Sequence, residues 1–195
     1  FMIYVSPVGP YFKGDLKFLN LKIETNFHRA ASKGIGNAKA IGNYSASLFP
    51  LVKAKKEGFD EVIYLDSISE DIIEEIGSAN LFIYHNGRLK TPKVSGSILK
   101  GVTRDSVCKI ASEILDIKVE ETDISLSDLF ESQEVFCTGT AVQITPVGRI
   151  TYNNEVYNYY SDDLGPITKK LKKTLTKIQR GEISDPFGWL SPIIT

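Results

Sequence analysis

Between residues 34 and 44 the chain reads Gly34-Ile35-Gly36-Asn37-Ala38-Lys39-Ala40-Ile41-Gly42-Asn43-Tyr44. One lysine lies among small residues here, with an amide and a phenol just downstream. Glycine lets the backbone turn tightly and lets another group come close. A lysine hemmed in by small or apolar neighbours loses hydration, which disfavours its charged form and makes its amine a usable nucleophile. Taken alone, the stretch fits either a Schiff-base lysine or a glycine-rich turn with a solvated lysine.

Two better-known glycine motifs do not match this stretch. A dinucleotide-binding fingerprint needs a third glycine at the position of Lys39. A P-loop needs Gly-Lys-Ser/Thr in sequence, whereas Ala38 precedes the lysine and Ala40 follows it. The sequence therefore favours neither a dinucleotide nor a nucleoside triphosphate as the ligand of this loop.

The composition is that of an ordinary soluble globular protein. The 195 residues include 23 basic and 24 acidic ones, for a net charge of −1, so nothing global attracts nucleic acid or an anionic membrane. No apolar run reaches transmembrane length, and Cys108 and Cys137 have no metal-binding spacing. We therefore expect a cytoplasmic protein with no metal, no nucleic-acid partner and no membrane partner.

The first residues also carry a prediction. Residues 1–5, Phe-Met-Ile-Tyr-Val, have the composition of a buried strand from the first position onward. Natural termini are usually loose and polar. We therefore expect the chain to be the C-terminal part of a longer protein.

Strands and helices alternate along the chain without internal repeats. Apolar alternation and short apolar runs predict strands at 19–25, 62–65, 72–76, 80–84, 88–90, 117–119, 134–137 and 142–145, and a hairpin over 152–157. Helical spacing predicts helices from about residue 42 to Gly58, from about 103 past 111, at 126–130 and from Pro166 to Gly181. This interleaving predicts one mixed α/β domain over residues 1–195.

The first of these helices carries two finer predictions. We expect Tyr44, Leu48, Leu51 and Val52 to lie on its inward face. Pro50 conflicts with a regular helix interior and predicts a kink or a restart.

Four loops could together hold a phosphorylated aldehyde cofactor. Besides the Lys39 loop they are Glu75–Asn80, Gly101–Thr103 at a predicted helix start, and the tight turn Gly139–Ala141. A helix start offers free N–H groups to a phosphate, and a turn with free amides can hold a carboxylate. An amine, an acid and a phosphate cradle are what pyridoxal phosphate needs.

With these stretches in view, the chain resembles the large domain of a branched-chain-amino-acid aminotransferase, of the fold-type IV class of pyridoxal-phosphate enzymes. The resemblance covers nearly the whole chain in family order and favours the Schiff-base interpretation of Lys39. It implies a pseudo-barrel of strands with packed helices, with the family's small N-terminal domain missing from this chain. The matching stretches are Ser6–Phe12, Gly36–Tyr44, Glu75–Phe82, Ser95–Arg104 and Gly139–Val147.

The resemblance also implies a role for each matching residue. Lys39 matches the Schiff-base lysine, Glu75 the partner of the pyridine nitrogen, and Tyr44 and Arg29 the residues beside the cofactor's 3-oxygen. The phosphate contacts match Ser78, Val102, Thr103 and Thr140. Thr140 and Ala141 match the turn that receives the substrate carboxylate, and Tyr11 lies in the loop that closes over the substrate side chain.

The implied reaction moves the amino group of L-leucine, L-isoleucine or L-valine to 2-oxoglutarate, giving branched-chain 2-oxo acids and L-glutamate. The family forms homodimers. Three alternatives stay open: a D-amino-acid aminotransferase, an aminodeoxychorismate lyase of the same fold, and a non-catalytic large-domain fragment.

Overall fold

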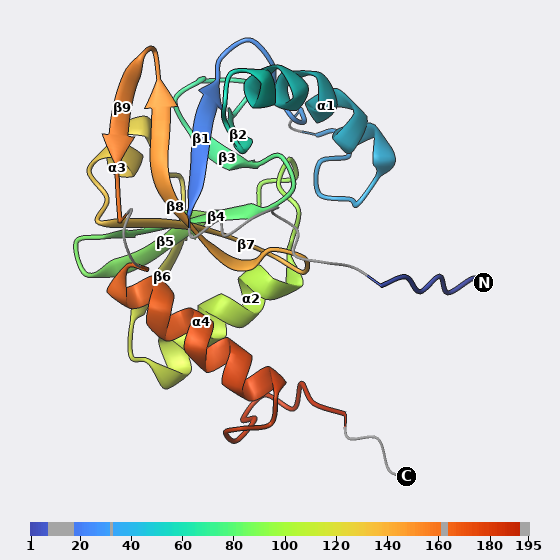
Figure 1. Cartoon of the computed structure of the whole chain (residues 1–195), viewed down its shortest axis with the longest axis vertical. Coiled ribbons are helices and arrows are strands. Elements are labelled where there is room, and N and C mark those ends of the chain that lie inside the picture. The colour runs from blue at the N-terminus through green and yellow to red at the C-terminus, as the bar shows by residue number, and fades with distance from the viewer. Residues whose placement is uncertain (8–17, 32, 161–163, 192–195) are drawn as a thin grey trace.

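The computed structural model describes residues 1–7, 18–31, 33–160 and 164–191. Strands within these ranges build one sheet, and helices lie outside it (Figure 1). The strands are β1 Leu19–Glu24, β2 Glu61–Leu65, β3 Ile73–Ile76, β4 Asn80–His85, β5 Arg88–Pro92, β6 Lys118–Thr122, β7 Glu134–Gly139, β8 Gln143–Tyr152 and β9 Glu155–Asn158. The helices are α1 Ile41–Lys56, α2 Val102–Lys109 with the π-helical turn η1 Ile110–Ile114, α3 Leu126–Phe130 and α4 Pro166–Gln179. The predicted mixed α/β class is confirmed.

The sheet curls back on itself. Its strand order is β3-β2-β1-β8-β7-β4-β5-β6, with β9 added beside β8. Strands β1 and β2, β1 and β8, and β5 and β6 run parallel, and the other pairs are antiparallel. β3 lies at one end of this order, yet a tight turn closed by the Ile76–Ala79 bridge leads straight into β4. The chain can make that short connection only because the sheet bends round, which leaves an opening at the turn.

Two hydrophobic cores use the two faces of the central strands. Leu81 and Ile83 of β4 belong to the core inside the curl, which α3 closes. Phe82 points the other way and stacks on Phe136 of β7, with ring centroids 5.1 Å apart. Helices α2 and α4 cover that second core (Figure 1). Because both faces are buried, these strands carry continuous apolar runs.

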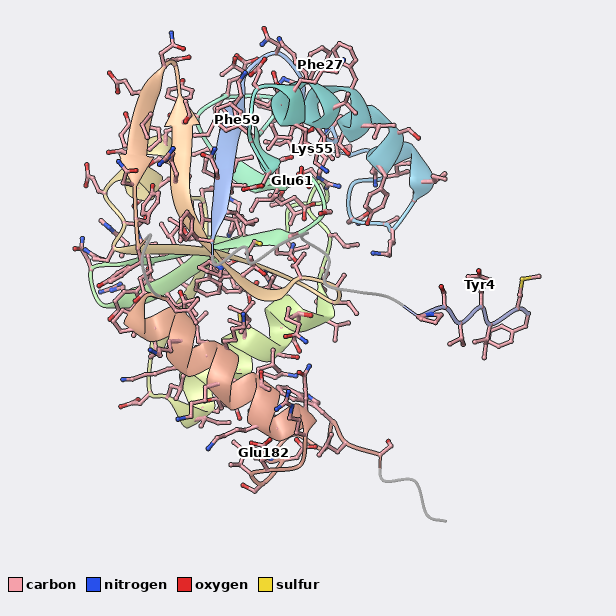
Figure 2. All side chains as sticks on the ribbon, viewed as in Figure 1. Tyr4, Phe27, Lys55, Phe59, Glu61 and Glu182 are labelled. Carbon is pink, nitrogen blue, oxygen red and sulfur yellow. The ribbon has the colours of Figure 1, made fainter. Side chains whose placement is uncertain are left out.

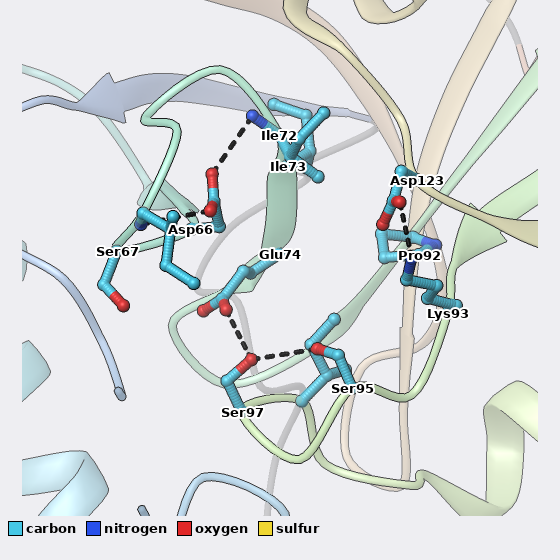
Figure 3. A pocket seen from close by; sticks show the side chains of 12 residues that line it. Asp66, Ser67, Ile72, Ile73, Glu74, Pro92, Lys93, Ser95, Ser97 and Asp123 are labelled. Carbon is cyan, nitrogen blue, oxygen red and sulfur yellow. Dashed lines mark hydrogen bonds and ion pairs between the residues drawn. The ribbon is translucent and has the colours of Figure 1, made fainter. Parts of the chain in front are cut away.

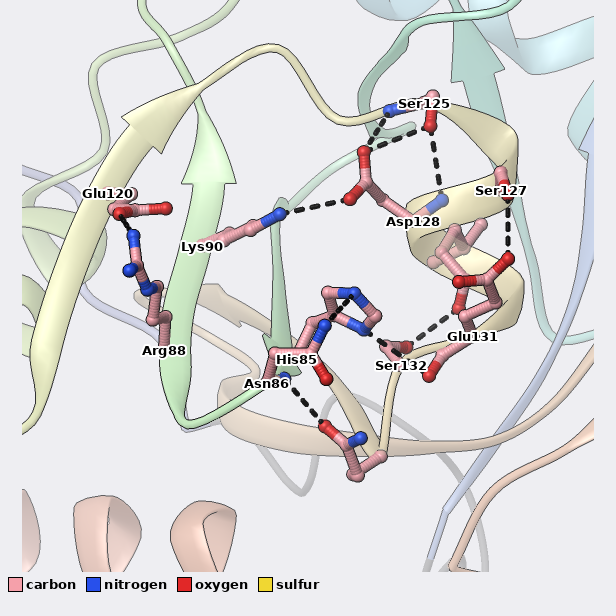
Figure 4. A network of polar contacts seen from close by, with 12 residues as sticks. His85, Asn86, Arg88, Lys90, Glu120, Ser125, Ser127, Asp128, Glu131 and Ser132 are labelled. Atoms are coloured by element: carbon pink, nitrogen blue, oxygen red, sulfur yellow. Dashed lines mark hydrogen bonds and ion pairs between the residues drawn. The ribbon is translucent and has the colours of Figure 1, made fainter.

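Local backbone and side-chain chemistry accounts for the turns and caps. Asn86 and Gly87 both adopt positive φ, 49° and 76°, in the hairpin between β4 and β5. Ser125 accepts a hydrogen bond from the Asp128 amide, and the Asp128 carboxylate accepts one from the Ser125 amide (Figure 4). This reciprocal capping box starts α3 at the predicted residue.

Helix α1 shows no restart at Pro50, and part of its predicted inward face is exposed. It runs unbroken through Pro50, and it buries Asn43, Ser47, Pro50 and Ala54. Leu48 and Val52, expected to face inward, are 58% and 44% exposed. Short side chains let this face approach β2 closely, and the Tyr64 hydroxyl of β2 donates to the Ser47 carbonyl at 3.2 Å. The buried face of α1 is therefore the one whose short side chains allow a close approach to β2, and not the one with the larger apolar area.

The expected strand at residues 1–5 is also absent. Residues 1–7 form no secondary structure, and the side chains of 1–5 are exposed. The segment runs away from the body of the protein, and Tyr4 lies far from the sheet (Figure 2). An apolar run becomes a strand only where a neighbouring strand offers hydrogen bonds to its backbone, and no described strand pairs with this segment.

Helix α4 forms over the predicted residues and completes the second core. α4 buries Leu171, Leu175 and Ile178, and the aromatic residues after it pack on the same core. At the end of η1, by contrast, the Ile114 side chain is 39% exposed. The π-helical turn that contains Ile114 departs from the 3.6-residue spacing, so the apolar stripe no longer faces inward at its end.

Candidate active site

One cavity of about 470 Å³ opens where the sheet curls back. This volume lies within the range of small-molecule sites. Every predicted site residue in the described part of the chain lines the cavity, whereas Tyr11 lies outside the described residues. The residues so gathered are Arg29, Lys39, Tyr44, Glu75, Ser78, Val102, Thr103, Thr140 and Ala141.

Four separate stretches of the chain meet at this opening. The loop before α1 brings Lys39, and α1 itself brings Tyr44. Strand β3 brings Glu75, and the turn after it brings Ser78. The start of α2 and the turn between β7 and β8 complete the wall. These segments are distant in sequence, so the curl of the sheet brings them together.

Lys39 and Tyr44 form one polar edge of the cavity. The Lys39 ammonium lies 3.3 Å from the Tyr44 hydroxyl and 5.6 Å from the centroid of its ring. The Lys39 side chain is exposed, so the predicted desolvation by small neighbours is wrong for the chain as it stands. The small residues around Lys39 keep the loop thin, and among the described residues none covers the amine.

Glu75 supplies a buried acid to the cavity. Its carboxylate pairs with Arg29 and accepts from the Leu99 amide at 3.1 Å and from the Asn80 side chain at 3.1 Å. Burial raises the pKa of Glu75 to about 7, and the guanidinium of Arg29 opposes that rise. Burial thus disfavours the charged form of this carboxyl, and a cationic ligand beside it would favour that form.

The structure places Arg29 against Glu75. The guanidinium also donates to the carbonyls of Gly36, at 3.3 Å, and Ser97. Its Nε is buried and has no hydrogen-bond partner among the described residues. The resemblance places Arg29 near the 3-oxygen of a cofactor, and this remains a prediction. In the structure Arg29 links the acid to the backbone of two loops.

The start of α2 forms a site for an anion. Gly101 precedes the helix, and no side chain in the described part of the chain caps the free N–H groups of the first turn. A Cβ at Gly101 would lie 2.2 Å from the Asn80 Oδ1, so only glycine fits beside that amide. Arg104 holds the helix in place because it donates to the Pro92 carbonyl and to Glu121, at 2.9 and 2.7 Å. The first-turn amides therefore face the cavity from a fixed position.

The turn after β7 completes the cavity. Thr140 and Ala141 are exposed at its rim. Thr138 just below is fully buried, and its hydroxyl has no partner among the described residues. Beside this turn the Ser78 hydroxyl lies 3.5 Å from the Glu61 carboxylate, and burial raises the pKa of Glu61. A buried hydroxyl without a partner is a group that a polar ligand would satisfy.

Sequence analysis missed several polar residues that build the site. Asn80 is the clearest, because its amide donates both to Glu75 and to the Leu99 carbonyl, at 2.8 Å for the latter. Asn80 lies in a stretch already singled out, but as an uncharged residue it gave no chemical signal. Glu74, Glu61 and Thr138 are also buried, and nothing in their sequence context predicts burial.

The two cysteines behave as core residues. Cys108 packs beside the second core, and burial raises the pKa of its thiol to about 11. Burial raises the pKa of the Cys137 thiol to about 12. Such thiols are poor nucleophiles near neutral pH, so the candidate nucleophiles at the cavity include the amines of Lys39 and Lys100.

Comparison with known proteins gives a consistent family. The family described as Amino-transferase class IV matches residues 3–150. A relative from Arabidopsis thaliana, branched-chain-amino-acid aminotransferase 5, chloroplastic, is 43% identical over 189 residues, covering 97% of this chain and 45% of that protein. The chain thus spans about half the length of the curated relatives that it matches.

Solved structures agree with the sequence matches. The branched-chain aminotransferase of Thermoproteus uzoniensis, solved with norvaline, has a TM-score of 0.82 at 32% identity, over 96% of this chain and 59% of that one. The branched-chain amino acid aminotransferase of Thermobaculum terrenum, solved in its PLP-form, has a TM-score of 0.76 at 26% identity, over 85% of this chain and 52% of that one.

Among the described residues, no helix has the length and apolar character needed to cross a membrane.

Proposed function

The chain belongs to the class IV aminotransferase family, and from this we propose that it is the cofactor-binding domain of a branched-chain-amino-acid aminotransferase. The reaction would move the amino group of L-leucine, L-isoleucine or L-valine to 2-oxoglutarate. One observation carries the proposal: an amine, a buried acid and the bare start of a helix line one cavity. The names of the matched relatives support the choice of substrate.

The residues present fit pyridoxal phosphate, the cofactor that we propose. The bare start of α2 suits a phosphate, and the buried Glu75 suits a ring nitrogen that carries a proton. The unpartnered Thr138 hydroxyl leaves a polar group for a ligand to satisfy. The Thermobaculum terrenum relative, solved in its PLP-form, supports the same choice.

When bound, this cofactor supplies an aldehyde that takes up amines and a ring that accepts electrons from the substrate Cα–H bond. The residues of the chain do the rest. Lys39 supplies the amine that holds the aldehyde and later takes the proton from the substrate Cα. Glu75 keeps a negative charge at the ring nitrogen, and Tyr44 lies within 3.3 Å of the lysine amine, where its hydroxyl orients it.

Phosphate and substrate carboxylate would bind at separate places. We assign the phosphate to the backbone amide of Val102 and to Thr103, with Ser78 and Thr140 completing the contacts. Thr140 and Ala141 present the turn that would hold the substrate carboxylate. Tyr11 keeps its proposed role over the substrate side chain.

Absorbance and borohydride reduction test the central assignment. We expect the protein to turn yellow with pyridoxal phosphate and borohydride to fix the label on Lys39. Lys39→Ala should abolish the fixed label. Lys100→Ala is the matched control, because Lys100 is another exposed lysine at the same cavity. Equal labelling of the Lys39→Ala variant would refute the assignment.

Steady-state assays test the substrate. L-Leucine with 2-oxoglutarate should give glutamate, and D-alanine or aminodeoxychorismate should not react. Turnover of either of those compounds would favour the D-amino-acid aminotransferase or the lyase. A protein that is labelled at Lys39 but turns over none of them would be a binding fragment. We also propose a homodimer in the cytoplasm, which size-exclusion chromatography and cell fractionation would check.

A further inference from the structure

The loop between β5 and α2 contains a buried hydrogen bond that the proposed reaction does not use directly. The Ser97 hydroxyl donates to the Glu74 carboxylate, and the two residues are 1% and 5% exposed (Figure 3). The second oxygen of Glu74 has no partner among the described residues. The Ser95 hydroxyl lies 3.1 Å from that of Ser97. Among the described residues, the Glu74 carboxylate therefore accepts a hydrogen bond from Ser97 alone.

The backbone of this loop supports both sides of the candidate active site. The Ser97 carbonyl accepts from Arg29, which pairs with Glu75. A Cβ on Gly36 would lie 2.2 Å from the Ser97 carbonyl oxygen, so the lysine loop rests directly on Ser97. The Asn37 amide donates to the Gly96 carbonyl at 3.0 Å, two residues before Lys39. A shift of Ser97 would therefore move the acid's partner and the lysine loop together.

We propose that Glu74 and Ser97 are positioning residues, whose hydrogen bond holds the 95–97 loop so that Arg29 stays on Glu75 and the Lys39 loop keeps its place. The inference rests on the proposed cofactor chemistry at Lys39 and Glu75. It assigns a role to the first of two consecutive glutamates, of which only the second reaches the cavity.

The charges around Glu75 predict that two variants shift its pKa in opposite directions. The charged groups that act on Glu75 are Arg29, Glu74 and Arg104; Arg29 and Arg104 lower its pKa, and Glu74 raises it. Replacing Glu74 by glutamine removes the carboxylate, which lowers the pKa of Glu75. Ser97→Ala frees Arg29 from its position and raises that pKa. Cofactor binding needs ionised Glu75, so the pH below which binding fails should move down in Glu74→Gln and up in Ser97→Ala.

The decisive comparison is Glu74→Gln with Glu74→Ala. Both variants lack the charge, but only the glutamine oxygen still accepts from Ser97. We expect pyridoxal phosphate to bind Glu74→Ala about tenfold more weakly than Glu74→Gln, the effect of one buried hydrogen bond. Hydrogen exchange of the Asn37 amide, measured without cofactor, should be faster in Glu74→Ala. Ser95→Ala, which removes a hydroxyl from the same loop, is the control and should match the parent.

Each outcome decides the proposal. Equal affinities and equal Asn37 exchange in the two Glu74 variants would overturn it, as would a Ser95→Ala effect as large as that of Ser97→Ala. If Glu74→Ala does not fold, Ser97→Ala against Ser95→Ala makes the same comparison. If the parent fails to bind pyridoxal phosphate, the proposed function fails, whereas the exchange measurement still tests the positioning role.

Discussion

Replacing Glu75 by glutamine should change how the stability of the cofactor-free protein depends on pH. The Glu75 side chain is buried, and its pKa rises from the ordinary 4.5 to about 7. A carboxyl whose pKa is raised in the folded state contributes stability that is fully present below pH 4.5 and lost as the pH rises through 7. At about 1.4 kcal/mol for each tenfold change in proton affinity, this loss is about 3 kcal/mol.

Glutamine cannot ionise, so the variant lacks this term. Urea unfolding of parent and variant at several pH values between 4.5 and 8.5 gives the free energy of unfolding of each. We expect the parent's value, relative to that of the variant, to fall by about 3 kcal/mol across this range. Arg29 loses its partner in the variant, but that cost does not depend on pH because the guanidinium stays charged.

The control is Glu113→Gln, which removes a carboxylate from an exposed position. Its stability difference from the parent should change little with pH, because the removed carboxylate is exposed to water in the folded protein as well as in the unfolded chain. A difference between parent and Glu75→Gln that stays constant from pH 4.5 to 8.5 would refute the reasoning. In that case hydration, or the charge of Arg29, would fully offset the effect of burial on the pKa of Glu75. The conclusion that burial raises this pKa would then be wrong.

Three further predictions concern the phosphate site, the amide beside the acid and a helix cap. Thr103→Ala should weaken binding of pyridoxal phosphate about tenfold and leave binding of pyridoxal, which lacks the phosphate, unchanged; an equal loss for both ligands would contradict the assignment. Asn80→Ala should lower the free energy of unfolding by about 1–3 kcal/mol, because Glu75 and a backbone carbonyl lose a buried donor; an unchanged urea midpoint would contradict this. Ser125→Ala should cost about 1 kcal/mol through loss of the cap on α3, and the exposed control Ser127→Ala less than about 0.5 kcal/mol; equal costs would contradict the capping role.

Elements governed by local chemistry were predictable. Asn86 and Gly87 adopt positive φ because their short side chains or absent Cβ allow it, and neighbours far along the chain have no part in that choice. Ser125 and Asp128 satisfy each other's amides within one turn of helix. The central strands carry apolar residues on both faces, and such runs predict burial without knowledge of the partner.

Predictions that depended on a distant partner failed. Leu48 and Val52 are apolar and correctly spaced, yet α1 turns its short side chains to β2, because Tyr64 and the backbone there require close approach. Residues 1–5 have the composition of a strand and find no edge to join among the described strands. The predicted desolvation of Lys39 also failed for lack of a distant neighbour. Covering its amine needs a group that the local sequence does not supply.

The sequence by itself determined the chemistry of this protein: which stretches carry the amine, the acid and the glycines, and hence which family it resembles. Covalent residue type and local backbone preference are properties that travel with each segment. Only the tertiary structure decided that Arg29 lies on Glu75, that Asn80 joins the acid to the start of α2, and that Glu74 holds Ser97. Those contacts depend on the curl of the sheet, which brings together segments that are far apart in the chain, and no local pattern specifies their distance.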